Sequence, residues 1–107
     1  MILRQWRGWT TPGDADRYEA IVRDVLAEIA GRGIDGYRGA YLVRRELAGE
    51  VEFGTLLLFD SMESVRVFAG HEDYEVAYVP EHAREFLSRF DERSAHFEVL
   101  LEPEGGS

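Results

Sequence analysis

One strand-like segment of this sequence is apolar on both of its sides. In VEFGTLLLFD (51–60), large apolar side chains occupy four consecutive positions from Leu56 to Phe59. Side chains alternate between the two faces of an extended strand, so Leu56 and Leu58 point to one face and Leu57 and Phe59 to the other. Helices on one face of a sheet would cover only half of these side chains. The segment therefore favours a sheet that is covered on both faces.

The two tryptophans raise the same question. Trp6 and Trp9 lie three residues apart in the strand-like segment 2–10, so their rings should point to opposite faces of one sheet. A bulge at Gly8 would instead bring Trp9 to the face of Trp6. In either arrangement the chain displays more aromatic surface than one layer of helices covers.

Hydrophobic periodicity and turn residues divide the rest of the chain into short elements. Asp14 is placed to cap a helix whose apolar stripe runs from Tyr18 to Ile29, and proline at position 80 suits the first turn of another helix. The predicted elements are a strand over 2–10, a helix over 14–31, a hairpin of 36–47 with 51–60, a short helix from 61 to about 70, a helix from 80 through Phe90, and a strand over 93–101.

This order of elements is typical of the ferredoxin-like, split βαβ fold, which is an α+β fold. It predicts a four-stranded antiparallel sheet with its helices on one face and the other face bare. The 107 residues fit one domain, over 1–102, followed by a disordered tail over 103–107. A bare apolar face is unusual for a monomer. We therefore expect a homodimer that stacks two sheets face to face and encloses a cavity.

Composition excludes several classes of function. The net charge of −9 argues against nucleic acid or an anionic membrane as a partner. The chain has no cysteine for thiol chemistry, no lysine for a Schiff base and no asparagine to stabilise an oxyanion. Residues 1–10 contain no apolar run that suits a signal peptide or a membrane span, so the expected location is the cytoplasm.

Four segments carry a resemblance to a known family: RQWRGWTTPGDADRYEAIV, GYRGAYLVRREL, EVEFGTLLLFDSMESVRVFAGHEDYEVAYVP and LSRFDERSAHFEV. From Ile2 to about Leu101 the chain resembles the antibiotic biosynthesis monooxygenase-like family of dimeric α/β barrels. The resemblance implies cofactor-independent oxygenation of polycyclic phenols or anthrones to quinones, or oxidative opening of haem. The haem-degrading branch is known for a trio of Asn, Trp and His. The absence of asparagine ranks haem degradation below oxygenation of a small aromatic substrate.

Three residues are the candidates for catalysis. His96 alternates with the apolar Ala95 and Phe97, and an imidazole suits a general base near neutral pH. Trp6 offers an aromatic wall and an indole donor, and Arg4 offers a cation for a substrate oxyanion. Each has a structural alternative: a hydrogen bond from His96 to a neighbouring strand or a partner chain, a core position for Trp6, and an inter-strand ion pair for Arg4.

Four aromatic residues are expected to bind the substrate: Trp9, Tyr41, Phe68 and Tyr74. Core packing is the alternative for Phe68, and packing against a partner chain is the alternative for Tyr74.

We expect no metal, because the cluster of His71, Glu72, Asp73 and His82 has no familiar ligand spacing. We expect no cofactor either, because an electron-rich carbanion formed by a base such as His96 can react directly with O₂. The sequence thus favours a cofactor-independent monooxygenase, an oxidoreductase of small aromatic or polycyclic phenolic substrates. The alternative is a non-enzymatic dimer that binds a small ligand or serves a housekeeping role.

Overall fold

The computed structural model describes residues 1–70 and 73–103. Five strands, three α-helices and a 3₁₀ turn follow one another along these residues: β1 (Ile2–Thr10), η1 (Pro12–Asp14), α1 (Ala15–Gly31), β2 (Tyr37–Leu47), β3 (Glu50–Phe59), α2 (Met62–Ala69), α3 (Glu81–Arg84), β4 (Arg89–Phe90) and β5 (Ala95–Glu98). The helix over 14–31 and the hairpin are thus confirmed to within one residue at each end, and Gly49 turns the hairpin with a positive φ.

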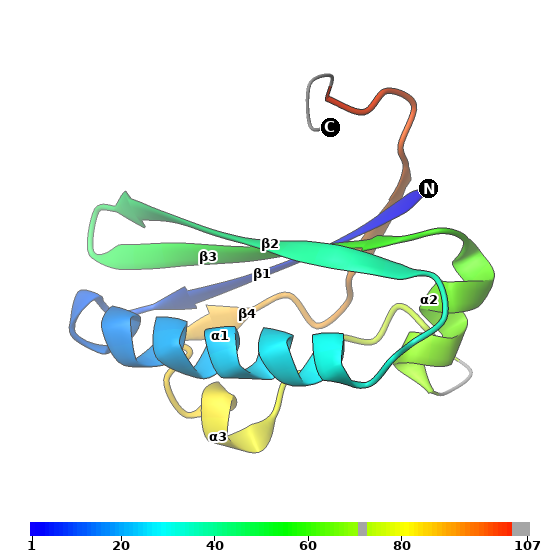
Figure 1. The fold of residues 1–107 in the computed structure, drawn as a ribbon. Coiled ribbons are helices and arrows are strands. Elements are labelled where there is room, and N and C mark those ends of the chain that lie inside the picture. The colour runs from blue at the N-terminus through cyan, green and yellow to red at the C-terminus, as the bar shows by residue number, and fades with distance from the viewer. Residues whose placement is uncertain (71–72, 104–107) are drawn as a thin grey trace.

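The strands form one antiparallel sheet in the order β2-β3-β1-β4, and β5 also pairs with β1. Figure 1 shows α1, α2 and α3 on one side of this sheet and no helix on the other. The predicted ferredoxin-like fold is therefore confirmed for the single chain.

The fourth strand differs from its prediction because it consists of two short pieces. Both β4 and β5 pair with the same edge of β1, where Gly8 lies opposite Phe90 and Gln5 lies opposite Ala95. Between these two pairs, β1 has two residues, Trp6 and Arg7, whereas the segment that joins β4 to β5 has four, 91–94. Asp91 N–H still donates to the Arg7 carbonyl of β1 at 2.9 Å, but the next residues bond to 75–77: Ala77 N–H donates to the Glu92 carbonyl at 3.0 Å and Ser94 N–H to the Glu75 carbonyl at 2.6 Å.

Two predicted helix features need correction. The helix that begins after Pro80 has only four residues, and Phe90 belongs to β4. Asp14 makes no side-chain cap, whereas Ser61 caps α2 by accepting the backbone N–H of Ser64 at 3.3 Å. The helical period predicts a helix through Phe90, but Phe90 pairs with Gly8 of β1, a residue far away in the sequence. Tertiary pairing of this kind overrides the local preference for a helix.

The register assigns the two tryptophans to opposite faces. Trp6 pairs with Thr55 and Trp9 with Glu52 in an unbroken ladder, so Gly8 hosts no bulge against β3. Trp6 lies on the helix-covered face, in the main core with Tyr18 and Phe53. A second core cluster, Leu57, Phe59 and Val65, lies between β3 and α2.

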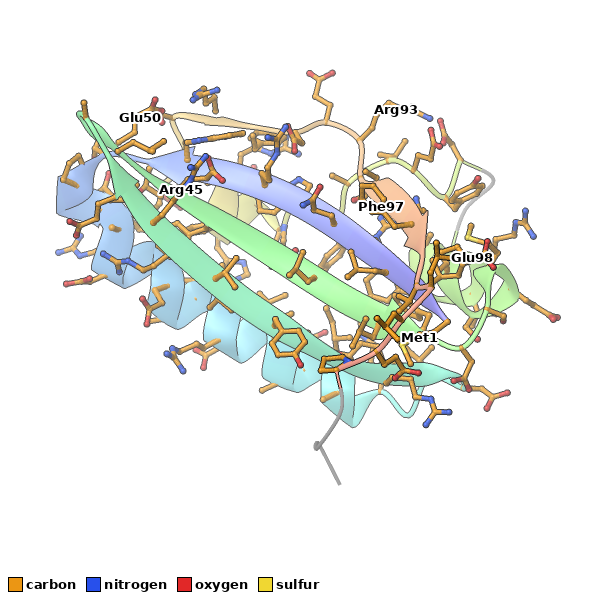
Figure 2. All side chains as sticks on the ribbon, turned by 90° about the horizontal axis from the view of Figure 1, so that it is seen from above. Met1, Arg45, Glu50, Arg93, Phe97 and Glu98 are labelled. Atoms are coloured by element: carbon orange, nitrogen blue, oxygen red, sulfur yellow. The ribbon has the colours of Figure 1, made fainter. Side chains whose placement is uncertain are left out.

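The uncovered face of the sheet is polar at one end and apolar at the other. Towards the hairpin turn, Trp9 is only 6% exposed because the guanidinium groups of Arg89 and Arg7 stack on it at 4.0 and 5.3 Å from the ring centre. Its indole N–H also donates to Glu52 at 3.2 Å. Figure 2 looks onto this face, with Arg45 and Glu50 at the hairpin end and Phe97 towards the other end. Large exposed apolar side chains on this face are Tyr41, Val43, Leu47 and Phe97.

No helix in the described part of the chain is both long enough and apolar enough to span a membrane.

Candidate active site between the sheet and helix α1

The helix-covered face of the sheet contains a pocket of about 60 Å³. Its floor is formed by β1 and β3, and its walls by α1, Phe68 of α2 and the segment 78–83. Apolar side chains make up most of the lining. Polar atoms enter it only from a few residues, which are Arg4, Thr55, Ser94 and the tyrosines Tyr18 and Tyr78. Burial of the Tyr18 ring raises the pKa of its hydroxyl, so this group stays neutral.

Arg4 is the charged group of the pocket, and it is only 4% exposed. Its guanidinium donates to the carbonyls of Tyr74 at 2.5 Å and Val76 at 3.1 Å, and it lies 5.4 Å from the ring centre of Phe68. In residues 1–70 and 73–103, no carboxylate forms an ion pair with Arg4, so the expected inter-strand ion pair is not formed there. Burial lowers the pKa of Arg4, yet a guanidinium remains protonated near neutral pH. The pocket therefore contains a buried positive charge.

His96 lies directly beside Arg4, because the two residues are paired between β5 and β1. His96 Nε2 is 2.9 Å from Arg4 Nη1. A guanidinium can only donate, so Nε2 accepts this hydrogen bond and the proton of the neutral ring resides on Nδ1. Burial first, and then the charge of Arg4, lower the pKa of His96, against a smaller opposing effect of Glu75. His96 is therefore neutral, and its lone pair is engaged by Arg4.

Trp6 contributes its ring to the pocket but not its donor. The indole N–H donates to the carbonyl of Asp91 at 2.7 Å, within the stretch that separates β4 from β5. The ring also packs at a tilt on Phe90, with 6.3 Å between the ring centres. The expected indole donor to a substrate is thus already occupied by the protein's own backbone.

The structure brings five of the seven predicted site residues together. Phe68 lines the pocket with Arg4 and Trp6, and the ring of Tyr74 meets His96 edge-on, with 5.2 Å between the ring centres. All five lie on the helix-covered side of the sheet, but only Arg4, Trp6 and Phe68 line the pocket; His96 and Tyr74 lie outside its lining. The pocket lies within a single chain, beneath the helices, and not on the uncovered sheet face.

Trp9 and Tyr41 are on the other face and do not reach this pocket. Trp9 pairs with Glu52, and Tyr41 pairs with Leu56. Leu56 is the neighbour of Leu57, whose side chain points to the helix-covered face, so Leu56 and Tyr41 point to the opposite face. Strand alternation fixes this separation. Tyr41 is 58% exposed there.

Sequence reasoning missed Ser94 and the two tyrosines of the lining. Ser94 has the same parity as His96 in RSAHFE, which is the signal that could have found it. The apolar stripe of the helix over 14–31 predicts only a core position for Tyr18.

The described residues offer no site for a metal or for haem. None of their His, Cys, Asp and Glu side chains form a group that could hold a metal ion, and His71 and Glu72 of the suspected cluster lie outside the described residues. The pocket has no His, Cys or Met in its lining, and 60 Å³ is far below the size of a porphyrin. These residues therefore do not fit haem.

Three solved structures share the architecture of this chain. A putative antibiotic biosynthesis monooxygenase from Bacillus cereus matches with a TM-score of 0.65 and 13% identity, over 95% of each chain. The haem degrader MhuD from Mycobacterium tuberculosis, solved with two haems in its active site, matches with a TM-score of 0.64 and 16% identity, over 96% of this chain and 99% of its own. Rv0793 from Mycobacterium tuberculosis matches with a TM-score of 0.59 and 18% identity, over 94% and 96%.

No protein-family model matches the chain, and no curated protein matches its sequence. The structural matches cover nearly the full length of both partners in each comparison, while the sequence identities remain low. The chain thus has the fold of antibiotic biosynthesis monooxygenase-like proteins, as its sequence resemblance predicts.

Proposed function

We propose that this protein is a cofactor-independent monooxygenase that acts on a small aromatic phenol or enol held in the pocket beneath α1. The observation that carries the proposal is the buried Arg4, which has no carboxylate partner in the described chain and lies in an otherwise apolar pocket. A buried cation of this kind favours the ionised form of a substrate hydroxyl.

The reaction needs only the substrate and dioxygen. Loss of one proton from an anthrone-type CH₂ group gives an anion whose charge is shared between carbon and oxygen. Arg4 holds the oxygen, and the carbon reacts with O₂ to give a hydroperoxide. Loss of water then leaves a carbonyl at that carbon, so one oxygen atom enters the product and the other leaves as water with both hydrogens of the CH₂ group.

In this scheme His96, which lies beside Arg4 just outside the pocket lining, accepts the substrate proton once the substrate has entered between them. Its Nε2 lone pair is bonded to Arg4 Nη1 in the unliganded protein. A neutral carbonyl oxygen of the substrate that takes over this donor would release the lone pair before the proton leaves, and the same donor then holds the oxyanion that forms. Trp6 and Phe68 supply the walls against which the aromatic ring packs.

The pocket must widen even for a substrate with one ring. About 60 Å³ is less than the roughly 150 Å³ of an engineered cavity that binds benzene. A polycyclic phenol therefore requires the segment 78–80, which forms one wall, to move away from α1.

Oxygen uptake tests the proposal. We expect uptake with a quinol and, more slowly, with an anthrone, and a loss of about 10²-fold or more in His96→Ala and Arg4→Gln. Arg23→Gln is the matched control, because Arg23 is an exposed arginine that pairs only with Glu19 on its own helix. Uptake at the background rate by the wild-type protein, or equal rates in Arg4→Gln and Arg23→Gln, would falsify the proposal.

A non-enzymatic ligand-binding protein is the second candidate. The hydrogen bond that ties the His96 lone pair to Arg4 favours it, because a histidine held in this way acts as a positioning group. Saturable binding of the same aromatic compounds without oxygen uptake would support this candidate. A haem titration that produces a protein-bound Soret band would instead support haem binding, and with it haem degradation as a candidate function.

We further propose that the uncovered sheet face pairs two copies of the chain. Its apolar end exposes Tyr41, Val43 and Phe97. After β5 the chain rises on this same side, as Figure 1 shows, and its Leu100 and Leu101 are 88% and 87% exposed. A face of this kind is typical of an interface that a second subunit covers.

A further inference from the structure

Ser94 lines the same pocket as Arg4, and its hydroxyl has no hydrogen-bond partner in the described part of the chain. The residue is 5% exposed and lines the pocket. Its Oγ makes no hydrogen bond with any of the residues that the structure describes. A buried hydroxyl without a partner destabilises the folded protein. Ser94 therefore acts against stability in the unliganded chain.

The two polar groups are held by one short segment of backbone. Arg4 donates to the carbonyls of Tyr74 and Val76, and the backbone N–H of Ser94 donates to the carbonyl of Glu75 between them. These bonds tie both residues to the carbonyls of three consecutive residues, and both residues line the same pocket. The unusual break between β4 and β5 is what brings Ser94 to this position.

From this pair we infer that the ligand of the pocket carries an anionic head with two adjacent oxygen atoms, one bound by Arg4 and the other accepting the Ser94 hydroxyl. The inference rests on the proposed function for the identity of the pocket as the substrate site. The head compensates the buried charge of Arg4 and provides the missing partner of Ser94. A carboxylate has this chemistry, as does an ionised hydroxyl next to a carbonyl, and the apolar lining receives a small ring attached to it.

Binding is measured through Trp6, the only tryptophan that lines the pocket. The chain has two tryptophans, and Trp9 lies on the opposite face of the sheet. In a Trp9→Phe background the fluorescence therefore reports on Trp6 alone. The probes are benzoate and salicylaldehyde for the two kinds of head, and benzamide as the uncharged isostere of benzoate.

Thr10→Val is the matched control for Ser94→Ala. Thr10 is fully buried and its Oγ1 also has no partner in the described chain, but the residue does not line the pocket. Removal of either hydroxyl should raise the Tm of the unliganded protein by a few degrees, about 4 °C, since each substitution relieves an unpaired buried group. Only Ser94→Ala should also weaken ligand binding.

We expect benzoate or salicylaldehyde to bind the Trp9→Phe protein at least about tenfold more tightly than benzamide. Ser94→Ala should reduce this affinity about tenfold, and Thr10→Val should leave it unchanged. Tighter binding of benzoate identifies a carboxylate head, and tighter binding of salicylaldehyde identifies a hydroxy-carbonyl head.

Two outcomes overturn the inference: equal affinities for benzamide and both anions, or a Ser94→Ala variant with a lower Tm and an unchanged affinity. The second outcome would make Ser94 a structural residue. Tight binding of an anionic probe with no oxygen uptake would retain the inference and reject the monooxygenase. Oxygen uptake with a simple phenol at a rate that Ser94→Ala leaves unchanged would retain the monooxygenase and reject the inference about the anionic head.

Discussion

At the scale of single residues, the pair Arg4 and His96 determines the chemistry of the pocket. The two side chains lie 92 positions apart in the chain and meet across β1 and β5 at 2.9 Å. The guanidinium fixes the tautomer of the imidazole, and burial, together with the charge of Arg4, lowers the pKa of His96 and keeps the ring neutral. The same contact gives His96 two possible roles, as a proton acceptor during turnover or as a support for Arg4.

The protonation of His96 should make stability depend on pH. Its pKa in the folded protein is lowered, so the folded state binds fewer protons than the unfolded state below the unfolded pKa of about 6.5. The free energy of unfolding should therefore fall as the pH drops through this range, until the folded pKa is passed. His96→Gln, which can still accept from Arg4, should lose less stability between about pH 7 and pH 5.

Chemical denaturation at the two pH values measures this difference. The other histidines contribute equally to both proteins, so they cancel in the comparison. Parallel pH dependences of the wild type and His96→Gln would contradict the assignment of a neutral, Arg4-bound imidazole.

Phe59 is the residue on which the core beneath α2 depends most. It is fully buried, and its ring lies between Tyr37 and Phe68, with 5.6 and 5.4 Å between ring centres. Phe59→Ala should lower the free energy of unfolding by about 3–5 kcal/mol, because it removes buried apolar surface and leaves a cavity. Val67→Ala on the exposed side of α2 is the control and should change it by less than about 0.5 kcal/mol. A loss below about 1 kcal/mol in Phe59→Ala would show that the core rearranges to fill the space.

At the scale of elements, close approaches between loops and helices decide how the layers meet. Gly36 joins α1 to β2 with a φ of +83°, and its carbonyl accepts the backbone N–H of Asp60 at 2.8 Å. A Cβ at this position would lie 2.0 Å from Ser64 Oγ at the start of α2. The turn therefore requires glycine for its φ and for its contact with α2.

Gly33 separates these two requirements experimentally. It has a φ of +66°, but a Cβ there would meet nothing within 4 Å. Gly33→Ala should cost about 1–2 kcal/mol from the backbone alone, and Gly36→Ala about 1–3 kcal/mol more because of the steric overlap. Equal losses in thermal or chemical denaturation would mean that Ser64 moves aside freely.

At the scale of the whole molecule, the helices of this chain cover one face of the sheet and leave the other to solvent or to a second subunit. The inner face contains both core clusters and the pocket. The outer face uses stacked arginines to cover Trp9, and it exposes Tyr41, Val43, Leu47 and Phe97. The two tryptophans are thus covered in different ways: Trp6 by the core beneath the helices, and Trp9 by the guanidinium groups of Arg7 and Arg89.

Charge placed on the outer face should dissociate the proposed dimer. We expect the wild type to sediment as a dimer at micromolar concentration, and Tyr41→Glu with Val43→Glu to sediment as a folded monomer, because a buried unpaired carboxylate opposes association. Val67→Glu is the control, since Val67 is equally exposed but lies on α2, on the other side of the sheet. A wild-type monomer, or a dimer that survives the double substitution, would refute the proposed interface.

The sequence alone determined those features that depend on neighbouring residues. The 3.6-residue period over 14–31 predicted α1, and strand-forming residues on either side of a short turn predicted the hairpin of 36–47 with 51–60. The odd spacing of Trp6 and Trp9 predicted that their rings lie on opposite faces. It also identified Arg4 and His96 as candidate site residues, because a guanidinium can bind an oxyanion and an imidazole can act as a base wherever they lie in the fold.

Only the tertiary structure decided which of these residues come into contact and which polar groups are left without a hydrogen-bond partner in the described chain. The pairing of Arg4 with His96, the break between β4 and β5, and the unpartnered hydroxyl of Ser94 all depend on which strands lie side by side and in what register. The face that carries the pocket was also set by this register. Periodicity is a property of the local chain, whereas pairing, burial and the satisfaction of hydrogen bonds are set by segments far apart in sequence.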